Sequence, residues 1–544
     1  MEKVESIVNK YWFVILVLLI IPAVWSLTIP GFYGASDDMH PAWVQQMDRS
    51  LKLGNFPPRM APDLSFGFGY PLWNFISPLP FYIAELVHLT GFNFVDSVKI
   101  TFALATILAA LSMYFLIRGL STSLIGLAAA ILYTYTPYRA VDIYVRGAMG
   151  EMWAFVFFPV ILLSIIKRWP FLGGLSISAL ILSHNIGTYM FLPPALLLGL
   201  FLSQGKKQEL LNLSLMFGIG ILGSIYFWLP ALLDSQLMRY DTLFNFADHY
   251  PVLRQLITPY WGYGGSHSGP DDGVSFFLGI TNLLVLVGGV GIIGMFYQKL
   301  SRLKLIIIGW SLLVFVGSVF MMNFRSVPLW IYLPMLDYFQ FPWRFLMMTT
   351  VSVPMMLMLL DRFKLGRWVA GLIIILAVLT TNSYFKPEHF LGRNDEYYLK
   401  RYIPIPVAQS EYYEIQEEYL RLPKATQIRP DKNYPVVNLS DPRATQISQY
   451  NGMNLSAIIN SENGTKLQFN KYYFPGWRAW VNNQEVEIKS GEPFNQMVIN
   501  IPKGQSLVDI KFTEVGHKII LDVVSLLTII GSILILFKRK FSYG

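Results

Sequence analysis

Two adjacent carboxylates and a histidine follow a long apolar run near the N-terminus. They are Asp37, Asp38 and His40, within the stretch GASDDMHPAW. Ionisable groups are costly in lipid, so their position at a membrane boundary requires a reason. One reason is chemical, because a carboxylate can act as a general base. The other is structural: Asp37 or Asp38 caps a helix over residues 39–53, with Pro41 in its first turn.

Further charged and aromatic residues gather in the stretches 54–82, 136–151, 183–188 and 339–345. Their arginines are candidates for holding an anion, since a guanidinium forms paired hydrogen bonds with phosphate or carboxylate. The alternatives are ordinary ion pairs for the charged residues, a membrane-interface belt for the aromatic residues and a structural hydrogen bond for the histidine. The candidate substrate-binding residues are His40, Arg59, Tyr70, Trp73, Arg139, Arg146, Glu151, His184, Asn185, Trp343 and Arg344.

Several other kinds of chemistry find no support in the sequence. The absence of cysteine excludes disulfides, thiol catalysis and Cys-ligated metal sites. No phosphate-binding loop of the G-x-x-x-x-G-K-[ST] type and no H-E-x-x-H metal motif is present. A divalent metal is compatible with Asp37 and Asp38 but not indicated, because adjacent aspartates are not a D-x-D pair. The metal ligands, if any, are unknown, and no cofactor is predicted.

The composition is that of a polytopic membrane protein. Of 544 residues, 54% are hydrophobic and only 14% are charged, whereas a soluble protein carries about a quarter charged residues. The net charge of +8 comes from Lys and Arg residues scattered between apolar runs, which argues against nucleic-acid binding. About twelve transmembrane helices are predicted, near 11–29, 98–117, 121–137, 151–166, 170–184, 186–202, 210–229, 274–297, 305–322, 345–360, 368–384 and 518–537.

The short loops predict the orientation of these helices. Alternate loops carry the basic residues, and all of them fall on one side if the N-terminus lies there too. The positive-inside rule makes that side cytoplasmic, with both termini in the cytoplasm of a plasma-membrane protein. The candidate residues then lie on the outer face. The apolar segment 71–90 contains three prolines and is predicted to be re-entrant or interfacial. Proline leaves backbone groups of a helix without hydrogen-bond partners, and lipid cannot supply such partners.

The chain is predicted to divide into three parts. Residues 1–384 form a transmembrane domain with a long first outer loop, 31–97. Residues 385–517 are soluble in composition and lie outside the membrane. From about residue 433, apolar and polar residues alternate in short runs, and turn residues separate the runs. This pattern predicts a β-sandwich; the runs include KLQFN, WRAWV, EVEIK, MVINI and LVDIKFT. Residues 518–544 form a last transmembrane helix and a basic cytoplasmic tail.

Three stretches resemble one family of membrane proteins. GNFPPRMAPDLSFGFGYPLWNFISPLPFY, YRAVDIYVRGAMGE and SHN look like the proteins labelled 6-pyruvoyl-tetrahydropterin synthase-related, which are similar in architecture to the GT-C superfamily of glycosyltransferases. The tail YYFPGWRAWVNNQEVEI resembles the β-domain of YfhO-type membrane proteins. The pterin label does not extend to function, because that soluble enzyme binds zinc through histidines and this chain has seven scattered ones.

The GT-C resemblance implies a role for each kind of candidate residue. An acidic residue of the first outer loop would activate the acceptor, and Asp38 matches that position better than Asp37. The arginines would hold the phosphate of a polyprenyl-phosphate-linked sugar donor, and Tyr70, Trp73 and Trp343 would line the sugar or lipid path. Sugar transfer needs a carboxylate to deprotonate the incoming hydroxyl, whereas a phosphate leaving group needs cations rather than an acid.

The leading hypothesis is therefore an integral-membrane glycosyltransferase that acts on an extracytoplasmic glycan, lipid or protein acceptor, with membrane lipids around it. One alternative is a transporter or flippase of a lipid-linked saccharide, which would place ionisable residues near the middle of its helices and often contains inverted repeats. Another is a non-catalytic membrane assembly protein.

Overall fold

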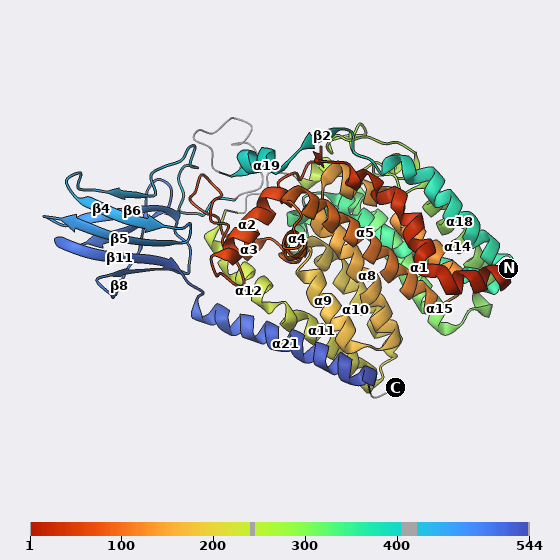
Figure 1. The fold of residues 1–544 in the computed structure, drawn as a ribbon. Coiled ribbons are helices and arrows are strands. Elements are labelled where there is room, and N and C mark those ends of the chain that lie inside the picture. The colour runs from red at the N-terminus through yellow and green to blue at the C-terminus, as the bar shows by residue number, and fades with distance from the viewer. Residues whose placement is uncertain (1, 240–244, 404–420, 542–544) are drawn as a thin grey trace.

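The computed structural model describes residues 2–239, 245–403 and 421–541. Figure 1 shows a helical body and, at one end of it, a β-domain. The N-terminal helix lies at the end of the body farthest from the β-domain, and the last helix runs back along the body from the β-domain toward the C-terminus.

Each of the twelve predicted apolar runs forms helix in the described residues. Within residues 2–239, 245–403 and 421–541, nine helices are long and apolar enough to cross a membrane, and a bent pair, Lys207–Gly223 with Ile225–Leu237, makes a tenth if it counts as one span. The remaining two runs form shorter helices. The helices are α1 (Glu2–Val24), α5 (Phe94–Arg118), α6 (Ser123–Thr134), α8 (Met149–Lys167), α9 (Pro170–Ile181), α10 (Asn185–Ser203), α11 (Lys207–Gly223), α12 (Ile225–Asp234), α14 (Ile280–Phe296), α15 (Arg302–Met321), α17 (Leu346–Ser352, continued by a 3-10 stretch to Arg362), α18 (Gly366–Thr381) and α21 (Gly516–Phe541).

The difference between twelve predicted spans and nine or ten long helices has a local cause. Helix α6 has 12 residues, all of them buried, so other helices surround it. Helix α9 also has 12 residues and packs against α8 and α11. A hydropathy pattern measures how apolar a segment is, but it does not say whether lipid or protein surrounds the segment.

The loops between the long helices contain short helices on the side of the β-domain. The first loop carries α2 (His40–Lys52), α3 (Leu72–Phe75) and α4 (Leu79–His88). Neither α3 nor α4 is long enough to span a bilayer, as the prolines of segment 71–90 predict. The other loops carry α7 (Pro137–Val141), α13 (Leu253–Ile257), α16 (Val327–Tyr332) and α19 (Asp395–Tyr402).

The predicted β-segment forms two antiparallel sheets. One has the order β3-β6-β10-β9 and the other β4-β5-β11-β7-β8. Aromatic rings of the two sheets pack against each other. The ring centre of Phe469 in β6 lies 5.7 Å from that of Trp477 in β7 and 5.9 Å from that of Tyr450 in β4. The strands are β3 (Val437–Leu439), β4 (Thr445–Tyr450), β5 (Asn454–Ser461), β6 (Thr465–Tyr472), β7 (Trp477–Val481), β8 (Gln484–Val486), β9 (Lys489–Gly491), β10 (Gln496–Ile501) and β11 (Gly504–Phe512).

One predicted strand is divided between the sheets. EVEIK forms the end of β8 in one sheet and the start of β9 in the other, so the chain changes sheets within it. The preceding turn follows the sequence closely. Asn482 and Asn483 both have positive φ, 51° and 65°, and they join β7 to β8 as a two-residue hairpin turn.

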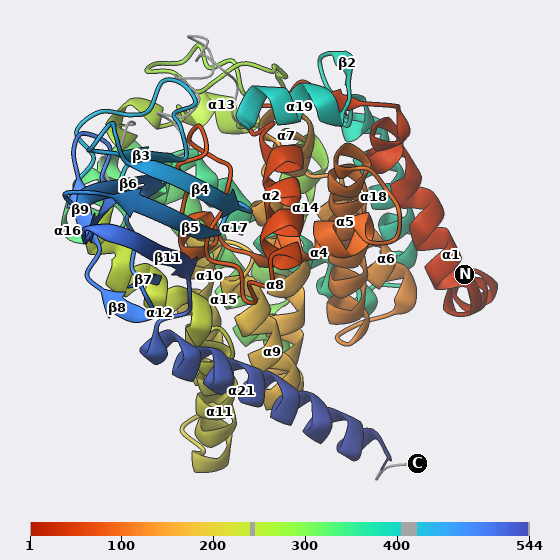
Figure 2. The same cartoon turned by 60° about the vertical axis from the view of Figure 1, so that its left-hand side comes forward.

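Contacts far apart in sequence hold the β-domain and the last helix to the body. Helix α21 packs along α9, α11 and α12 (Figure 2). The backbone N–H of Tyr472 donates to the carbonyl of Phe68 in the first loop at 2.9 Å. A two-stranded sheet pairs β1 (Phe32–Tyr33) with β2 (Phe390–Arg393) and brings the segment before α19 next to the segment that carries the aspartates.

Candidate functional site

The aspartate segment is joined by hydrogen bonds to the end of a π-helical turn, Asp142–Arg146. The backbone N–H of Ser36 donates to the carbonyl of Val145 at 3.0 Å, and that of Asp37 donates to the carbonyl of Arg146 at 2.7 Å. Single π turns inside helices are rare and frequently lie at functional sites. This turn places the Arg146 side chain and the aspartates on the same side of the body.

Gly147 makes this close approach possible. It has a φ of 73°, and a Cβ atom at this position would lie 2.9 Å from the carbonyl oxygen of Asp37. Its own carbonyl lies 2.6 Å from Nε2 of His40, a buried side chain. Burial lowers the pKa of His40 from its ordinary value, so the ring is neutral at pH 7 and donates this hydrogen bond from Nε2. His40 therefore fastens the start of α2 to Gly147.

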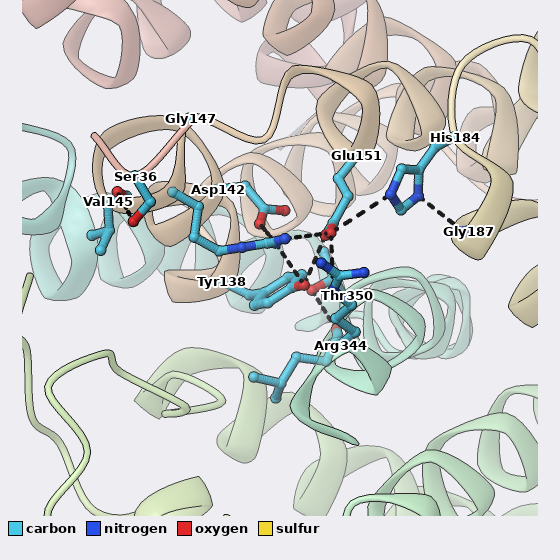
Figure 3. Close-up of polar contacts among 12 residues, drawn as sticks. Ser36, Tyr138, Asp142, Val145, Gly147, Glu151, His184, Gly187, Arg344 and Thr350 are labelled. Carbon is cyan, nitrogen blue, oxygen red and sulfur yellow. Dashed lines mark hydrogen bonds and ion pairs between the residues drawn. The ribbon is translucent and has the colours of Figure 1, made fainter. Parts of the chain in front are cut away.

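The carboxylate of Glu151, in the first turn of α8, is the centre of a buried polar cluster (Figure 3). It accepts hydrogen bonds from Arg146 Nη2 at 2.7 Å and from the hydroxyl of Tyr138 at 2.8 Å. Nε of Arg344 and Nε2 of His184 each lie 3.8 Å from it. Arg146 also pairs with Asp142 at 2.5 Å. Three segments that are distant in sequence thus meet at one carboxylate: 138–151, His184 and Arg344.

The histidine of this cluster has a defined orientation. Nδ1 of His184 accepts the backbone N–H of Gly187 at 2.9 Å and caps α10, so in the neutral ring the hydrogen is on Nε2, the nitrogen that faces Glu151. Asn185, next in the chain, is held by Ser77, whose hydroxyl donates to its side-chain oxygen at 3.0 Å.

Arg344 is the cation of the cluster with the fewest protein partners. Its Nε makes no hydrogen bond within the part of the chain that the structure describes. The guanidinium lies 5.2 Å from the ring centre of Phe341, and that of Arg146 lies 4.9 Å from the ring of Trp343. Asp37 is near enough to act on Arg344 electrostatically. Two guanidinium groups, aromatic rings and a half-buried aspartate therefore share one site.

Asp37 and Asp38 have different surroundings. The Asp38 side chain is buried; its carboxylate accepts a hydrogen bond from the hydroxyl of Tyr402 in α19 and lies 3.9 Å from Nε of Arg401. Burial raises the pKa of Asp38 from its ordinary value, and the Tyr402 hydrogen bond opposes that shift. Asp37 is half-buried. Neither aspartate is the N-cap of α2, which begins at His40: the N-cap is Met39, and its side chain makes no capping hydrogen bond within the described residues.

Comparison with known proteins gives few matches. No protein-family model matches the chain. An uncharacterised protein of Lactococcus lactis subsp. cremoris is 26% identical over 229 residues, which are 39% of this chain and 37% of that protein, so the match spans little more than a third of the relative.

Two solved structures of an oligosaccharyltransferase from Archaeoglobus fulgidus align more extensively. One is the apo form, and the other is a complex with an inhibitory peptide and a dolichol-phosphate. The TM-scores are 0.44 and 0.43 at 14% identity, over 78% and 79% of this chain and 62% of that protein. Both TM-scores lie below 0.5, so the likeness is a loose one.

Arg139 lies beside the cluster but is fully enclosed. Its guanidinium lies 5.2 Å from the ring centres of both Tyr133 and Phe155, and its nitrogens make no hydrogen bond to any residue in the described ranges. Burial lowers the pKa of Arg139 to about 10, so it stays charged at neutral pH. Arg139 has no exposed surface, so it influences the cluster only through the electrostatic effect of its positive charge.

Three predicted site residues lie elsewhere. Arg59 is buried under the β-domain, where it pairs with Asp522 of α21 at 2.8 Å and with Glu514 at 3.3 Å. Tyr70 and Trp73 are buried in the first loop, with the Trp73 ring 4.9 Å from that of Phe81. The structure therefore gives Arg59 the ion-pair role that was the alternative for these arginines.

Sequence reasoning missed two hydroxyl groups that define the site. Tyr138 lies inside the stretch TPYRAVDIYVRGAMGE and bonds Glu151, but a tyrosine there also fits an interfacial belt. Tyr402 is 364 residues from its partner Asp38. No local spacing indicates that contact, because it depends on how α19 packs over α2.

Proposed function

We propose that this protein is an integral-membrane glycosyltransferase that uses a polyprenyl-phosphate-linked sugar donor. The observation that carries the proposal is the gathering of Arg146 and Arg344 around Glu151, with the half-buried Asp37 joined through its backbone N–H to the carbonyl of Arg146 at 2.7 Å. This combination supplies what the reaction needs: cations for a leaving phosphate and a base for an incoming hydroxyl.

In the proposed reaction Arg344 holds the donor phosphate. Its Nε makes no hydrogen bond within the described residues, and 12% of the Arg344 side chain is exposed, so the guanidinium has capacity for a charge-assisted hydrogen bond to a phosphate oxygen. Arg146 is already fixed by Asp142 and Glu151, so it contributes a preorganised charge at little entropic cost. As the bond between the anomeric carbon and the phosphate oxygen breaks, the polyprenyl phosphate leaves as an anion, which both guanidiniums stabilise.

We assign the general base to Asp37 rather than to Asp38. A base must be reached by the acceptor hydroxyl, and Asp37 is half-buried, whereas the Asp38 carboxylate is buried and already accepts the Tyr402 hydroxyl. The acceptor proton moves to Asp37 as the new carbon–oxygen bond forms. Asp38 then positions the segment through α19.

The place of the charges favours an enzyme over a transporter. Glu151 lies in the first turn of α8, and Arg344 is the third residue of the span Pro342–Arg362. Both are at helix ends, whereas transport sites are typically near the bilayer midplane.

The β-domain is packed on the first loop by hydrogen bonds such as that of Lys471 Nζ to the Pro62 carbonyl at 2.7 Å, which supports a role in acceptor choice.

The matched pair Asp37→Asn and Asp38→Asn tests the proposal. The assay presents the protein in nanodiscs with a panel of radiolabelled polyprenyl-phosphate-linked hexoses and with glycan, lipid and peptide acceptors. It measures the hexose transferred and the polyprenyl phosphate released. Asp37→Asn should lower turnover by roughly 10²–10⁴-fold with donor binding retained, because an amide cannot accept the proton. Asp38→Asn should lower it less. Turnover undiminished in Asp37→Asn would refute the base assignment.

The phosphate site needs its own test, and donor binding is the readout. Arg344→Gln should weaken binding of unsugared polyprenyl phosphate by about tenfold or more, the effect of one charge-assisted hydrogen bond. Arg59→Met provides the control, since Arg59 is buried in another cluster. Equal losses in both folded variants would argue against a phosphate site at Glu151.

A further inference from the structure

A second polar site lies at the opposite end of the helical body from Glu151. Helix α8 carries Glu151 in its first turn and Ser164 near its last turn, and 13 residues of helix span about 20 Å. Helix α10 also starts beside the cluster, at Asn185, and ends at Ser203. In Figure 2 this is the lower end, away from α2. The basic short loops lie at this end, which the positive-inside rule predicts to be cytoplasmic.

A cavity of about 240 Å³ opens here between α8, α10, α11 and α15. Ser164 and Arg168 line it from the end of α8, Asn212 from α11, and Arg302 from the start of α15. The space is large enough for a phosphate with a small polar substituent.

The polar groups of the cavity favour an anion. The Ser164 hydroxyl is buried, with 1% of the residue exposed, and makes no hydrogen bond within the described part of the chain. Arg168 is neutralised by Glu209, with Nε 2.7 Å from the carboxylate. Arg302 forms no ion pair with any described residue, so the lining keeps one unbalanced positive charge.

The remaining lining indicates which anion fits. Apolar side chains, among them Ile165, Leu303 and Ile306, complete the wall. Trp169 at the rim is 45% exposed, as is usual for a tryptophan at a membrane interface. A cavity with a cation and an unpartnered hydroxyl beside apolar helix faces suits a ligand with a phosphate and a hydrocarbon chain. Basic pockets between transmembrane helices on the cytoplasmic side bind anionic lipid headgroups.

We propose that this cavity binds the phosphate headgroup of an anionic phospholipid, with Arg302 as the cationic ligand and Ser164 as a hydrogen-bond donor. The site is separate from the proposed transferase site and does not depend on that function. It would anchor the ends of α8, α11 and α15 to the lipid leaflet at the basic end of the body.

Native mass spectrometry of the full chain in detergent tests the proposal with no need for enzyme activity. With added phosphatidylglycerol, the wild type should retain one molecule per chain, and Arg302→Gln should lower its apparent affinity by about tenfold. Lys299→Gln is the matched control: it removes a charge from an exposed residue at the same end that does not line the cavity. Its effect should be less than about twofold.

Two further ligands identify the source of the phosphate. Phosphatidylcholine, whose headgroup has no net charge, should bind more weakly than phosphatidylglycerol. Inorganic phosphate at millimolar concentration should not displace the lipid; displacement would assign the cavity to free phosphate and overturn the lipid proposal. Equal losses in Arg302→Gln and Lys299→Gln, or equal binding of the two lipids, would also overturn it. Both substituted residues are exposed, so both variants should fold.

Discussion

Replacing Glu151 by glutamine should separate folding stability from phosphate binding. The substitution keeps the size of the side chain and removes the charge that holds the cluster together. At 2.7 Å the attraction between Glu151 and Arg146 is about 6 kcal/mol for an effective dielectric constant of about 20. The cost of desolvating both groups offsets part of it, and breaking a buried pair typically costs about 3–5 kcal/mol.

The expected result is a large loss of stability without a loss of phosphate binding. Glu151→Gln should lower the free energy of unfolding by about 3 kcal/mol or more, since Asp142 is then the one carboxylate paired with Arg146 among the described residues, and Arg344 loses the carboxylate 3.8 Å from its Nε. The same change removes a negative charge next to the proposed phosphate, so polyprenyl phosphate should bind the folded variant as tightly as the wild type or more tightly.

Glu209→Gln is the matched control for this experiment. Glu209 also pairs with an arginine at 2.7 Å, but Arg168 has 57% of its side chain exposed, and such pairs contribute about 0–1 kcal/mol. The measurements are thermal unfolding in detergent and binding of labelled polyprenyl phosphate to the monodisperse fraction. Equal stability losses in the two variants would refute the argument from burial. Weaker phosphate binding in folded Glu151→Gln would refute the argument from charge.

Three further predictions follow from other parts of the molecule. Arg59→Met should lower the free energy of unfolding by about 3–5 kcal/mol, because it leaves Asp522 and Glu514 without their buried cation; thermal unfolding measures this. Burial lowers the pKa of Lys471 to about 7, so the unfolded chain binds more protons above that pH and stability rises with pH up to the ordinary lysine value. Lys471→Met removes the cost of burying this charge, so it should raise the unfolding temperature relative to the wild type. The increase should be larger at pH 6 than at pH 9. In intact cells, a membrane-impermeant thiol reagent should label Asn460→Cys but not Lys207→Cys, both exposed sites; the reverse result would invert the predicted orientation.

Local patterns predicted the elements of this fold well because each pattern depends on a few neighbouring residues. Helix α2 over His40–Lys52 follows from its proline and the glycine beyond it, and the hairpin at Asn482 and Asn483 follows from the αL preference of asparagine. The predictions that failed depend on whether lipid or other helices surround an element. The sequence of α6 is apolar enough for a span, yet its short length and complete burial are consequences of packing.

The candidate site shows the same limit at the level of single residues. Arg59, Arg146 and Arg344 have the same side chain and similar aromatic neighbours in sequence, but a carboxylate from α21 neutralises Arg59, whereas Glu151 gathers the other two. The choice between Asp37 and Asp38 likewise depends on Tyr402, which reaches Asp38 from the other side of the chain. Burial and contacts with distant segments decide how accessible a cation or a base is, and sequence spacing does not record them. The order of effects expected here, Asp37→Asn above Asp38→Asn in lost turnover and Arg344→Gln above Arg59→Met in lost phosphate binding, therefore tests the tertiary contacts themselves.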